Sequence, residues 1–390
     1  MKRRNFLRSG ALAASGAIYA GTGNINAASL AGKIYSEPPP LFETVNFTRD
    51  GLDFSPAEQV KMLEKIVSAG EIHADDYSNG GVVEELENKF ARLLGKESAV
   101  FMPTGTMANH IALRMLAGDR KRILVQEESH IYNDSGDCCQ QLSGLNLVPL
   151  VTAHNGFTLE DVRAAVERTA TGRVTTGVGV ISIESPVRRR NNQVFSYPEM
   201  GRIADYAKQN GINMHLDGAR LFNAVGHTGI SPIEYSKLFD TVYISLYKCF
   251  NAPSGAILAG TEEFTRNLYH TRRMLGGGIV SVWQSAAIAL QFADTFLDDY
   301  REALDNAGQL KKILEKRQEF SFEQIPDGTN VFILKMVNKD PLKVRERLGE
   351  QNIILPAPGK EPGTFYMKVN PSINRTTPGI LAERFIEALG

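Results

Sequence analysis

The sequence predicts an α/β protein whose larger part is a mainly parallel sheet and whose C-terminal part is a smaller α+β domain. Three observations support this fold class. The chain has 390 residues, a length typical of about two domains. Its 43% hydrophobic and 22% charged residues are ordinary for a globular protein. Up to about residue 282, apolar runs of strand length alternate with amphipathic helical stretches, as in a parallel sheet covered on both faces.

The strands expected in the larger part are short apolar runs, several of them rich in β-branched residues. They are 98–102, 122–126, 145–151, 177–183, 213–216, 241–246 and 256–259. Between them, apolar residues recur at helical spacing. The helices expected there are 106–116, 159–168 and 197–209. We assign these elements to a large, ligand-binding domain over residues 45–285.

The pattern changes toward the C-terminus, where long helical stretches precede short strands. The expected helices are 282–295, 298–319, 342–348 and 378–389. The expected strands are 329–335 and 364–369. We assign residues 286–390 to the small α+β domain.

Charge and composition exclude several classes of partner. With 43 Lys and Arg against 44 Asp and Glu, no basic excess points to nucleic acid. Outside the N-terminus, no apolar run is long enough to span a bilayer. Three cysteines in the whole chain are too few for a disulfide framework. We therefore predict neither a nucleic-acid nor a membrane partner, and no metal site.

Residues 1–30 are predicted to be an export signal rather than part of the fold. Arg3 and Arg4 precede Asn5-Phe6-Leu7, which resembles a twin-arginine signal, and a weakly apolar stretch with small residues follows. This predicts a periplasmic or otherwise exported protein. A frayed basic terminus on a cytoplasmic protein is the alternative. Residues 31–44 include three consecutive prolines and are predicted to be a stiff linker.

Polar residues follow several predicted strands, at the sheet edge where parallel α/β proteins bind ligands. After strand 98–102, Gly105 and Thr106 open a helix. Free N–H groups and a hydroxyl at a helix N-terminus suit an anion such as phosphate. A plain helix N-cap is the alternative explanation of this turn.

Asp217 follows strand 213–216. A carboxylate there needs a partner. A protonated heterocycle nitrogen is one candidate, because the ion pair keeps an aromatic ring electron-poor. A structural pair with Arg220, or a simple turn aspartate, is the alternative.

Lys248 emerges directly after the apolar strand 241–246. Partial desolvation there favours an amine nucleophile that can form a Schiff base. Ser245, three residues earlier, is expected to reach the same anion as Thr106. A lysine that extends its charge to solvent is the alternative for Lys248.

His130 follows strand 122–126 and is suited to stacking on a ring or relaying a proton. An ordinary loop histidine is the alternative. Together these segments supply an anion-binding turn, an aromatic partner, a carboxylate and a Schiff-base lysine. Pyridoxal 5'-phosphate fits this combination best, because that cofactor carries carbanion chemistry while the protein sets orientation and protonation.

The same motifs resemble the threonine aldolase and β-eliminating lyase family of fold-type I pyridoxal-phosphate enzymes. The resemblance covers residues 45–389. Its strongest segments, in family order, are Phe101 to Asn109, His215 to Ala224, Lys248 with Ala252-Pro253-Ser254-Gly255, and Gly276-Gly277-Gly278.

The resemblance implies a role for each matching residue. Lys248 would carry the Schiff base, and Asp217 would pair with the pyridine nitrogen. Arg220 would contact the ring hydroxyl. His130 would stack on the ring and act as a base.

The resemblance also implies how the site is completed. Gly105 and Thr106 would bind the phosphate, and Tyr77 would lie at the mouth of the site. Because family sites form between subunits, it implies a homodimer or homotetramer with shared sites. Gly276-Gly277-Gly278 would then face a neighbour's phosphate.

Several positions depart from the family pattern, and they are those that hold and orient substrate. The usual Ser before the Schiff-base lysine is Tyr247, and the C-terminal Arg that binds the substrate carboxylate is replaced by Lys368. Lysine is a point charge and cannot make the planar two-bond contact of arginine. The early Arg-Ser-Asp-Thr stretch appears as Thr48-Arg49-Asp50-Gly51.

Arg188-Arg189-Arg190 follow strand 177–183, where the family has Glu-Asn-Thr-His-Asn. A solvated turn is one interpretation. The other is a substitute anion clamp, in which Arg188 contacts the carboxylate of a substrate. Arg188, Tyr77 and Lys368 are the predicted substrate-binding residues.

The sequence thus predicts a pyridoxal-phosphate-dependent lyase of the threonine aldolase type, which cleaves a β-hydroxy-α-amino acid to glycine and an aldehyde. His130 is the first candidate for the base near the β-hydroxyl. The nearest alternative is another reaction of the same cofactor, namely β-elimination, racemisation or transamination. A non-catalytic binding protein with this fold is a further alternative, opposed by the presence of Lys248.

Overall fold

The computed structural model describes residues 44–151 and 156–390. The predicted export signal at 1–30 lies outside the described residues, as does the predicted linker at 31–44 except for Thr44. Within the described part, the strands form one seven-stranded, one three-stranded and one two-stranded sheet.

The seven-stranded sheet has the order β2-β8-β7-β6-β5-β3-β4. Its strands are β2 (Ser98–Met102), β3 (Arg122–Gln126), β4 (Asn146–Leu150), β5 (Val178–Glu184), β6 (Asn213–Asp217), β7 (Thr241–Ser245) and β8 (Ala256–Gly260). All neighbouring strands are parallel except β8, which runs antiparallel to both β2 and β7. The predicted mainly parallel sheet is confirmed.

The two smaller sheets bring the C-terminal region together with the first described residues. The antiparallel sheet contains β9 (Phe320–Gln324), β10 (Val331–Met336) and β12 (Thr364–Lys368). The parallel pair consists of β1 (Val45–Asn46) and β11 (Ile353–Ile354). The predicted small α+β region is therefore also confirmed.

The helices fill the connections between these strands. The longer helices are α3 (Pro56–Ala69), α4 (Gly81–Leu94), α5 (Gly105–Ala117), α8 (Leu159–Ala170), α9 (Tyr197–Gln209), α10 (Leu221–Thr228), α14 (Trp283–Ala293), α15 (Phe296–Leu314), α16 (Pro341–Glu350) and α17 (Pro378–Glu387). The shorter ones are α6 (His130–Asn133), α7 (Cys138–Ser143), α11 (Pro232–Ser236), α12 (Glu262–Thr265), α13 (Leu268–Met274) and the 3₁₀ turns η1 (Arg188–Arg190) and η2 (Pro371–Arg375).

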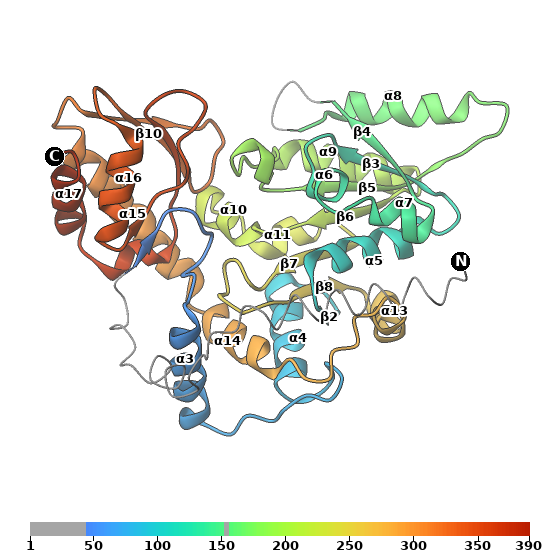
Figure 1. Cartoon of the computed structure of the whole chain (residues 1–390). Coiled ribbons are helices and arrows are strands. Elements are labelled where there is room, and N and C mark those ends of the chain that lie inside the picture. Colours follow the sequence, from blue (N-terminus) through green and yellow to red (C-terminus); the bar gives the residue numbers. More distant parts are fainter. Residues whose placement is uncertain (1–43, 152–155) are drawn as a thin grey trace, which may run out of the picture. The chain divides into compact units, whose positions relative to one another are not determined.

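Helices cover both faces of the seven-stranded sheet (Figure 1). The side chains of its strands alternate between these faces. In β8, Ile257 and Ala259 pack into one core with α4, α9 and α14, whereas Ala256 and Leu258 pack into another with α5 and α13. This period of two is the geometry of a strand buried on both sides. All seven residues of β5 are buried, which explains its continuous apolar character in the sequence.

The C-terminal region has a core of its own, built from α15, α16, α17 and the three-stranded sheet. Val45 and Phe47 pack into this core as well. The backbone N–H of Lys368 donates to the carbonyl of Phe47 at 2.9 Å. The chain that follows β1 is thereby anchored beside the end of β12, and this brings Asp50 and Lys368 close together.

The structure differs from the predicted helices in the end of one of them and in several helices that were not predicted, α3, α4 and α10 being the longest. The helix expected at 298–319 ends at Leu314, because a turn in which Arg317 N donates to Leu314 O leads into β9. The sequence analysis did not predict α3 or α4. α4 begins at Gly80 and Gly81, whose φ values of 70° and 53° belong to a turn; two adjacent glycines ordinarily indicate a loop.

Phe250, two residues after Lys248, is the centre of an aromatic cluster. Its ring centre lies 4.9 Å from those of Phe90 and Phe222 and 5.8 Å from that of Phe296. These rings come from α4, α10 and α15, so Phe250 joins three helices behind the lysine.

We expect Phe250→Ala to lower the free energy of unfolding by about 3–5 kcal/mol, because it removes a buried ring and leaves a cavity. Urea unfolding followed by circular dichroism measures this change. Leu342→Ala, at an exposed position of α16, is the control and should change stability by less than about 0.5 kcal/mol. Equal losses in the two variants would contradict the importance of the cluster.

Candidate active site

A cavity of about 780 Å³ opens at the carboxyl ends of the parallel strands. Its wall consists of the residues that follow β2, β5, β6 and β7, of His130 at the start of α6, and of the segment after β1. The predicted site residues that line it are Gly105, Thr106, His130, Arg188, Asp217, Arg220, Lys248 and Lys368. The structure therefore brings together eight residues that the sequence spreads over more than 260 positions.

The first residues of α5 form one end of the cavity. Thr104 is the N-cap, and its hydroxyl accepts the N–H of Met107 at 3.2 Å. The N–H groups of the first turn have no partner within the helix, so they and the helix dipole favour a bound anion. A Cβ at Gly105 would lie 1.9 Å from the hydroxyl oxygen of Tyr243. Only glycine allows this close approach of backbone and phenol.

Ser245 was predicted to reach the same anion, but it is fully buried and is not among the lining residues. Tyr243 lies on the same face of β7, two residues earlier, and does line the cavity. The long phenol side chain of Tyr243 reaches Gly105. Tyr243 is therefore a further residue beside the anion site, and the role of Ser245 stays a prediction.

Asp217 is buried at the end of β6, and two neutral donors hold its carboxylate. Asn109 Nδ2 donates to Oδ2 at 2.6 Å, and the N–H of Ala219 donates to Oδ1 at 3.1 Å. Among the described residues, no Lys, Arg or His forms an ion pair with this carboxylate. The structural pair of Asp217 with Arg220, left open by the sequence, is therefore not formed.

His215 extends this hydrogen-bond chain to β7. Burial lowers the pKa of His215 to about 4, so its ring is neutral. Its Nε2 donates to Oδ1 of Asn109 at 2.9 Å, and its Nδ1 accepts from the hydroxyl of Thr241 at 2.8 Å. The orientation of Asn109, and through it that of Asp217, is fixed by the strand next to β6.

His130 enters the cavity from the start of α6. Its backbone N–H donates to Oε2 of Glu184 at 2.6 Å, and Oε1 of the same carboxyl group accepts the N–H of Arg188 at 3.0 Å. Glu184 thereby positions two segments of the cavity wall. Burial lowers the pKa of His130, which favours a neutral ring that can accept a proton.

Glu184 is itself a proton-holding group in the cavity wall. Burial, and then the nearby charge of Asp217, raise the pKa of Glu184 to about 7. The side-chain amide of Gln126 donates to its carbonyl and accepts its N–H, both at 2.8 Å. Glu184 and Asn109 are site residues that were not predicted from the sequence. The available signals were the position of Glu184 at a strand end and that of Asn109 in the segment from Phe101.

Lys248 lies on the short connection between β7 and β8. Leu246 N donates to Gly255 O, and Ala252 N donates to Leu246 O, both at 3.1 Å, so the connection is closed on itself. Lys248 is half-buried, and its Nζ lies 4.7 Å from the ring centre of Tyr247. Both side chains line the cavity, and the aromatic face favours a nearby ammonium group.

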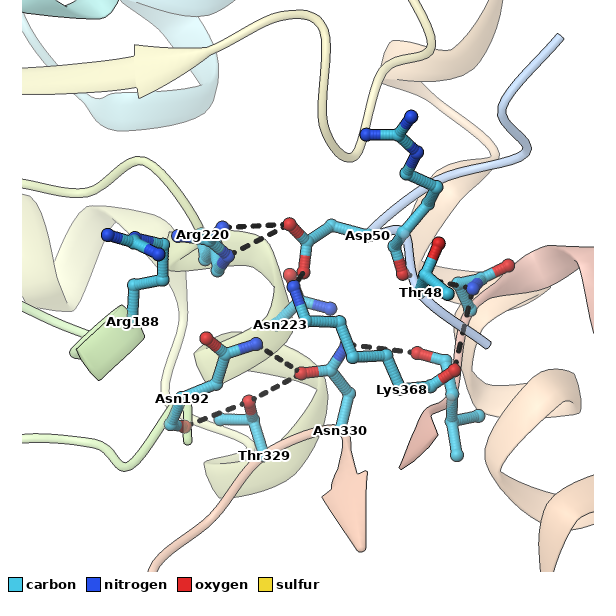
Figure 2. A network of polar contacts seen from close by, with 12 residues as sticks. Thr48, Asp50, Arg188, Asn192, Arg220, Asn223, Thr329, Asn330 and Lys368 are labelled. Atoms are coloured by element: carbon cyan, nitrogen blue, oxygen red, sulfur yellow. Dashed lines mark hydrogen bonds and ion pairs between the residues drawn. The ribbon is translucent and has the colours of Figure 1, made fainter. Parts of the chain in front are cut away.

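Asp50 is a site residue that the sequence analysis quoted only as part of an altered motif. Its Oδ2 lies 2.9 Å from Arg220 Nη2, and its Oδ1 lies 3.2 Å from Lys368 Nζ. Figure 2 shows two contacts from Arg220 that converge on one oxygen of Asp50, Oδ2. The cation predicted to bind a substrate carboxylate is therefore already paired with a carboxylate of the protein.

The arginine turn η1 is paired rather than simply solvated. Arg188 and Arg189 both bind Asp134, and Arg190 Nε donates to Glu128 at 2.7 Å. The hydrogen bonds from Arg189 and Arg188 lower the pKa of Asp134 to about 2. Arg188 lines the cavity and Arg189 does not, so only the first of them is placed for contact with a ligand.

Tyr77 lies outside the cavity, beside the segment that follows the three glycines. Its N–H donates to Val280 O at 2.8 Å, and the guanidinium of Arg273 lies 4.5 Å from its ring centre. The buried Arg272 binds the carbonyls of Tyr77, at 3.1 Å, and Phe101, at 2.6 Å. Tyr77 thus contacts residues on either side of the three glycines, and neither Tyr77 nor Gly276-Gly277-Gly278 lines the cavity of its own chain.

Residues 44–151 and 156–390 contain no cluster of three or more His, Cys, Asp or Glu suited to a metal ion. In the same residues, no helix combines the length and the apolar character needed to cross a bilayer. Cys138, Cys139 and Cys249 are free thiols.

Comparison with known proteins supplies an independent line of evidence. The profile of the β-eliminating lyase family matches residues 58–335. A low-specificity L-threonine aldolase from Candida albicans is 31% identical over 274 residues, which cover 69% of this chain and 72% of that protein. An alanine racemase from Cochliobolus carbonum is 34% identical over 197 residues, which cover 50% of this chain and 49% of that protein.

A solved structure also matches over most of the chain. A candidate L-allo-threonine aldolase from Listeria monocytogenes has a TM-score of 0.73 and 26% identity, and the match covers 89% of this chain and 96% of that one. This similarity confirms the predicted fold class.

Because the pKa of Glu184 is raised in the folded chain, its contribution to the free energy of unfolding depends on pH. Between the ordinary value of 4.5 and about 7, the folded chain holds a proton that the unfolded chain has lost, so this group's contribution to stability falls as pH rises. We expect Glu184→Gln to lack this pH-dependent contribution, because the glutamine amide does not titrate. Its stability relative to the wild type should therefore rise between pH 5 and pH 8 in urea unfolding. Glu383→Gln, on the exposed side of α17, is the control; parallel wild-type and Glu184→Gln profiles would contradict the expectation.

Proposed function

The chain belongs to the β-eliminating lyase family, and from this premise we propose that it is a pyridoxal-phosphate-dependent lyase of the threonine aldolase type. It cleaves a β-hydroxy-α-amino acid to glycine and an aldehyde. One observation carries the proposal: Lys248 and Asp217 line the same cavity, and Asp217 is held by neutral donors alone. A buried carboxylate without a cationic partner favours a ligand that brings its own positive charge.

The residues present fit pyridoxal phosphate at its phosphate, its ring nitrogen and its carbonyl carbon. The phosphate suits the N–H groups of the first turn of α5, where Gly105 also lets the hydroxyl of Tyr243 approach the backbone. The ring nitrogen suits Asp217. Lys248 supplies the amine that would hold the carbonyl carbon of the cofactor, and its short, closed loop fixes where that amine lies.

When bound, the cofactor supplies an electron sink for the negative charge left on Cα after the Cα–Cβ bond breaks. The chain supports this chemistry by holding a proton on the ring nitrogen. Asp217 favours that proton electrostatically. Asn109 and His215 keep the carboxylate of Asp217 in one orientation.

His130 is the residue placed to take the proton of the β-hydroxyl. It lines the cavity, and burial lowers its pKa, so at neutral pH its ring can accept a proton. Its backbone is tied to Glu184, which holds the ring at a constant place in the wall.

The similarity to an alanine racemase over half of the chain favours one second candidate, proton exchange at Cα with the same cofactor. The products separate the two reactions. Release of glycine and acetaldehyde from L-threonine supports the aldolase. Appearance of D-alanine from L-alanine without glycine release from threonine supports the racemase.

Two further expectations from the sequence belong to this proposal. Export in the folded state, through the signal at residues 1–30, would let the enzyme take up its cofactor before transport. A homodimer or homotetramer with shared sites would account for Tyr77 and Gly276-Gly277-Gly278 lying outside the cavity of their own chain. Size-exclusion chromatography with light scattering tests the oligomeric state, and a monomeric holoenzyme would contradict it.

Lys248→Ala tests the cofactor attachment directly. We expect the wild type with added pyridoxal phosphate to show a violet absorbance band that borohydride converts into a stable adduct on Lys248, because only the covalently held cofactor is trapped. Lys248→Ala should give no trapped adduct. The surface variant Lys237→Ala should behave as the wild type. An equal adduct in Lys248→Ala would remove the lysine from this role.

His130→Phe separates stacking from proton transfer, because phenylalanine keeps an aromatic ring and has no basic nitrogen. We expect kcat for L-threonine cleavage to fall about 100-fold to 10,000-fold, the usual contribution of a general base. Cofactor affinity, measured by absorbance titration, should change only about threefold or less, since ring stacking is retained. A kcat close to that of the wild type would rule out His130 as the base.

A further inference from the structure

Asp50 fills the space between two cations that face the cavity. Its carboxylate accepts hydrogen bonds from Arg220 Nη2 at 2.9 Å, from Arg220 Nε at 3.0 Å and from Lys368 Nζ at 3.2 Å (Figure 2). The side chain of Asp50 is 7% exposed and that of Arg220 is 6% exposed. A carboxylate of the protein therefore occupies the position that an incoming carboxylate would need in order to bind Lys368.

The backbone around Asp50 keeps this carboxylate in place. The N–H of Leu52 donates to Asn251 Oδ1 at 2.7 Å, and Asn370 Nδ2 donates to the carbonyl of Arg49 at 3.0 Å. A Cβ at Gly51 would lie 2.2 Å from the carbonyl oxygen of Lys248. Removing Asp50 from the pair would also leave the buried Arg220 without a counter-charge, which is strongly unfavourable.

Asp50 remains charged over the pH range in which proteins are folded. Burial alone would raise its pKa, but Arg220 and Lys368 together hold the pKa of this carboxyl well below its usual range. A second carboxylate at Lys368 would therefore meet a fixed negative charge at close range. The repulsion between like charges in a buried site works against that position.

Arg188 is the cavity cation that can be released without leaving a carboxylate unpaired. Its partner Asp134 is shared with Arg189, so Asp134 keeps one arginine when Arg188 turns to a ligand. The side chain of Arg188 is 42% exposed, and exposed ion pairs are weak. Its N–H is bound to Glu184 at 3.0 Å, which fixes the point from which the side chain extends.

We propose that Asp50 determines substrate binding by neutralising Arg220 and Lys368, and that Arg188 instead binds the α-carboxylate of the amino acid. The planar guanidinium of Arg188 supplies the two parallel hydrogen bonds that a lysine cannot make. The inference rests on the proposed function and identifies, within that site, the residue that recognises the substrate.

The test is the dissociation constant of glycine, measured with holoenzyme from the change in the visible spectrum of the bound cofactor. Arg188→Gln should weaken glycine binding about tenfold or more, the size expected for a charge-assisted pair. Arg168→Gln is the control, because Arg168 is an exposed arginine of α8 that has no part in the Asp134 pairing and does not line the cavity. It should change the constant less than about twofold, as a surface residue does.

Variants of the other cations decide between alternatives. Lys368→Met leaves Asp50 paired with Arg220 and should change the constant less than about threefold, whereas loss of a bidentate carboxylate contact costs tenfold or more. A tenfold effect in Lys368→Met or in Arg49→Gln, with none in Arg188→Gln, overturns the proposal. Asp50→Asn should tighten glycine binding by opening the position beside Lys368; weakening of it counts against the role of Asp50. If Asp50→Asn does not fold, the glycine dissociation constant of Lys368→Met still shows whether Lys368 binds the carboxylate.

The outcomes also separate this inference from the proposed function. A wild-type protein that shows no cofactor band defeats both. A wild type with a cofactor band that glycine shifts, but with equal constants in Arg188→Gln and Arg168→Gln, leaves the proposed function standing and overturns only the inference.

Discussion

The pairing of Asp50 with Arg220 and Lys368 connects parts of the chain that otherwise belong to different cores. Arg220 follows β6 of the large sheet, Lys368 ends β12 of the small sheet, and Asp50 comes from the segment after β1. The three groups depend on one another, because removal of one partner from a buried ion pair leaves the other charge uncompensated. Gly51 contacts the carbonyl of Lys248, so the position of the lysine depends on the same pairing.

The other acidic groups near the cavity are each stabilised in a different way. Asp134 has two arginines, and burial gives Glu184 a pKa of about 7. Asp217 has no positively charged partner in the described part of the chain, because the two groups that hold its carboxylate, a side-chain amide and a backbone N–H, are both neutral. Among the residues that the structure describes, the cavity thus presents the carboxylate of Asp217 without a cation and the amine of Lys248 without a carboxylate, which together complement a phosphorylated, nitrogen-containing ring. Electrostatic complementarity of this kind selects a cofactor before any reaction begins.

Much of the fold could be predicted from local patterns. β3 and α9 have the bounds expected from the sequence, because apolar periodicity and flanking turns specify an element within a few residues. α4 was missed because its start at two glycines indicates a loop. The motif residues of the site were also recognisable one by one. Their partners were not, since Asp50 and Lys368 are 318 positions apart and nothing local indicates that they meet. The reach of long side chains was also not predictable from the sequence, as the contact of Tyr243 with Gly105 shows.

The spacing of these contacts along the chain also gives the cavity an order of assembly. The connection that carries Lys248 closes over a few residues, between Leu246 and Gly255. Asp50 and Arg220 are separated by 170 positions, and Asp50 and Lys368 by 318. The entropic cost of closing a loop increases with the number of residues between the two contacts. A nascent chain leaves the ribosome N-terminus first. During synthesis the loop that carries Lys248 can therefore form early. Asp50 can pair with Lys368 only after β12 has left the ribosome.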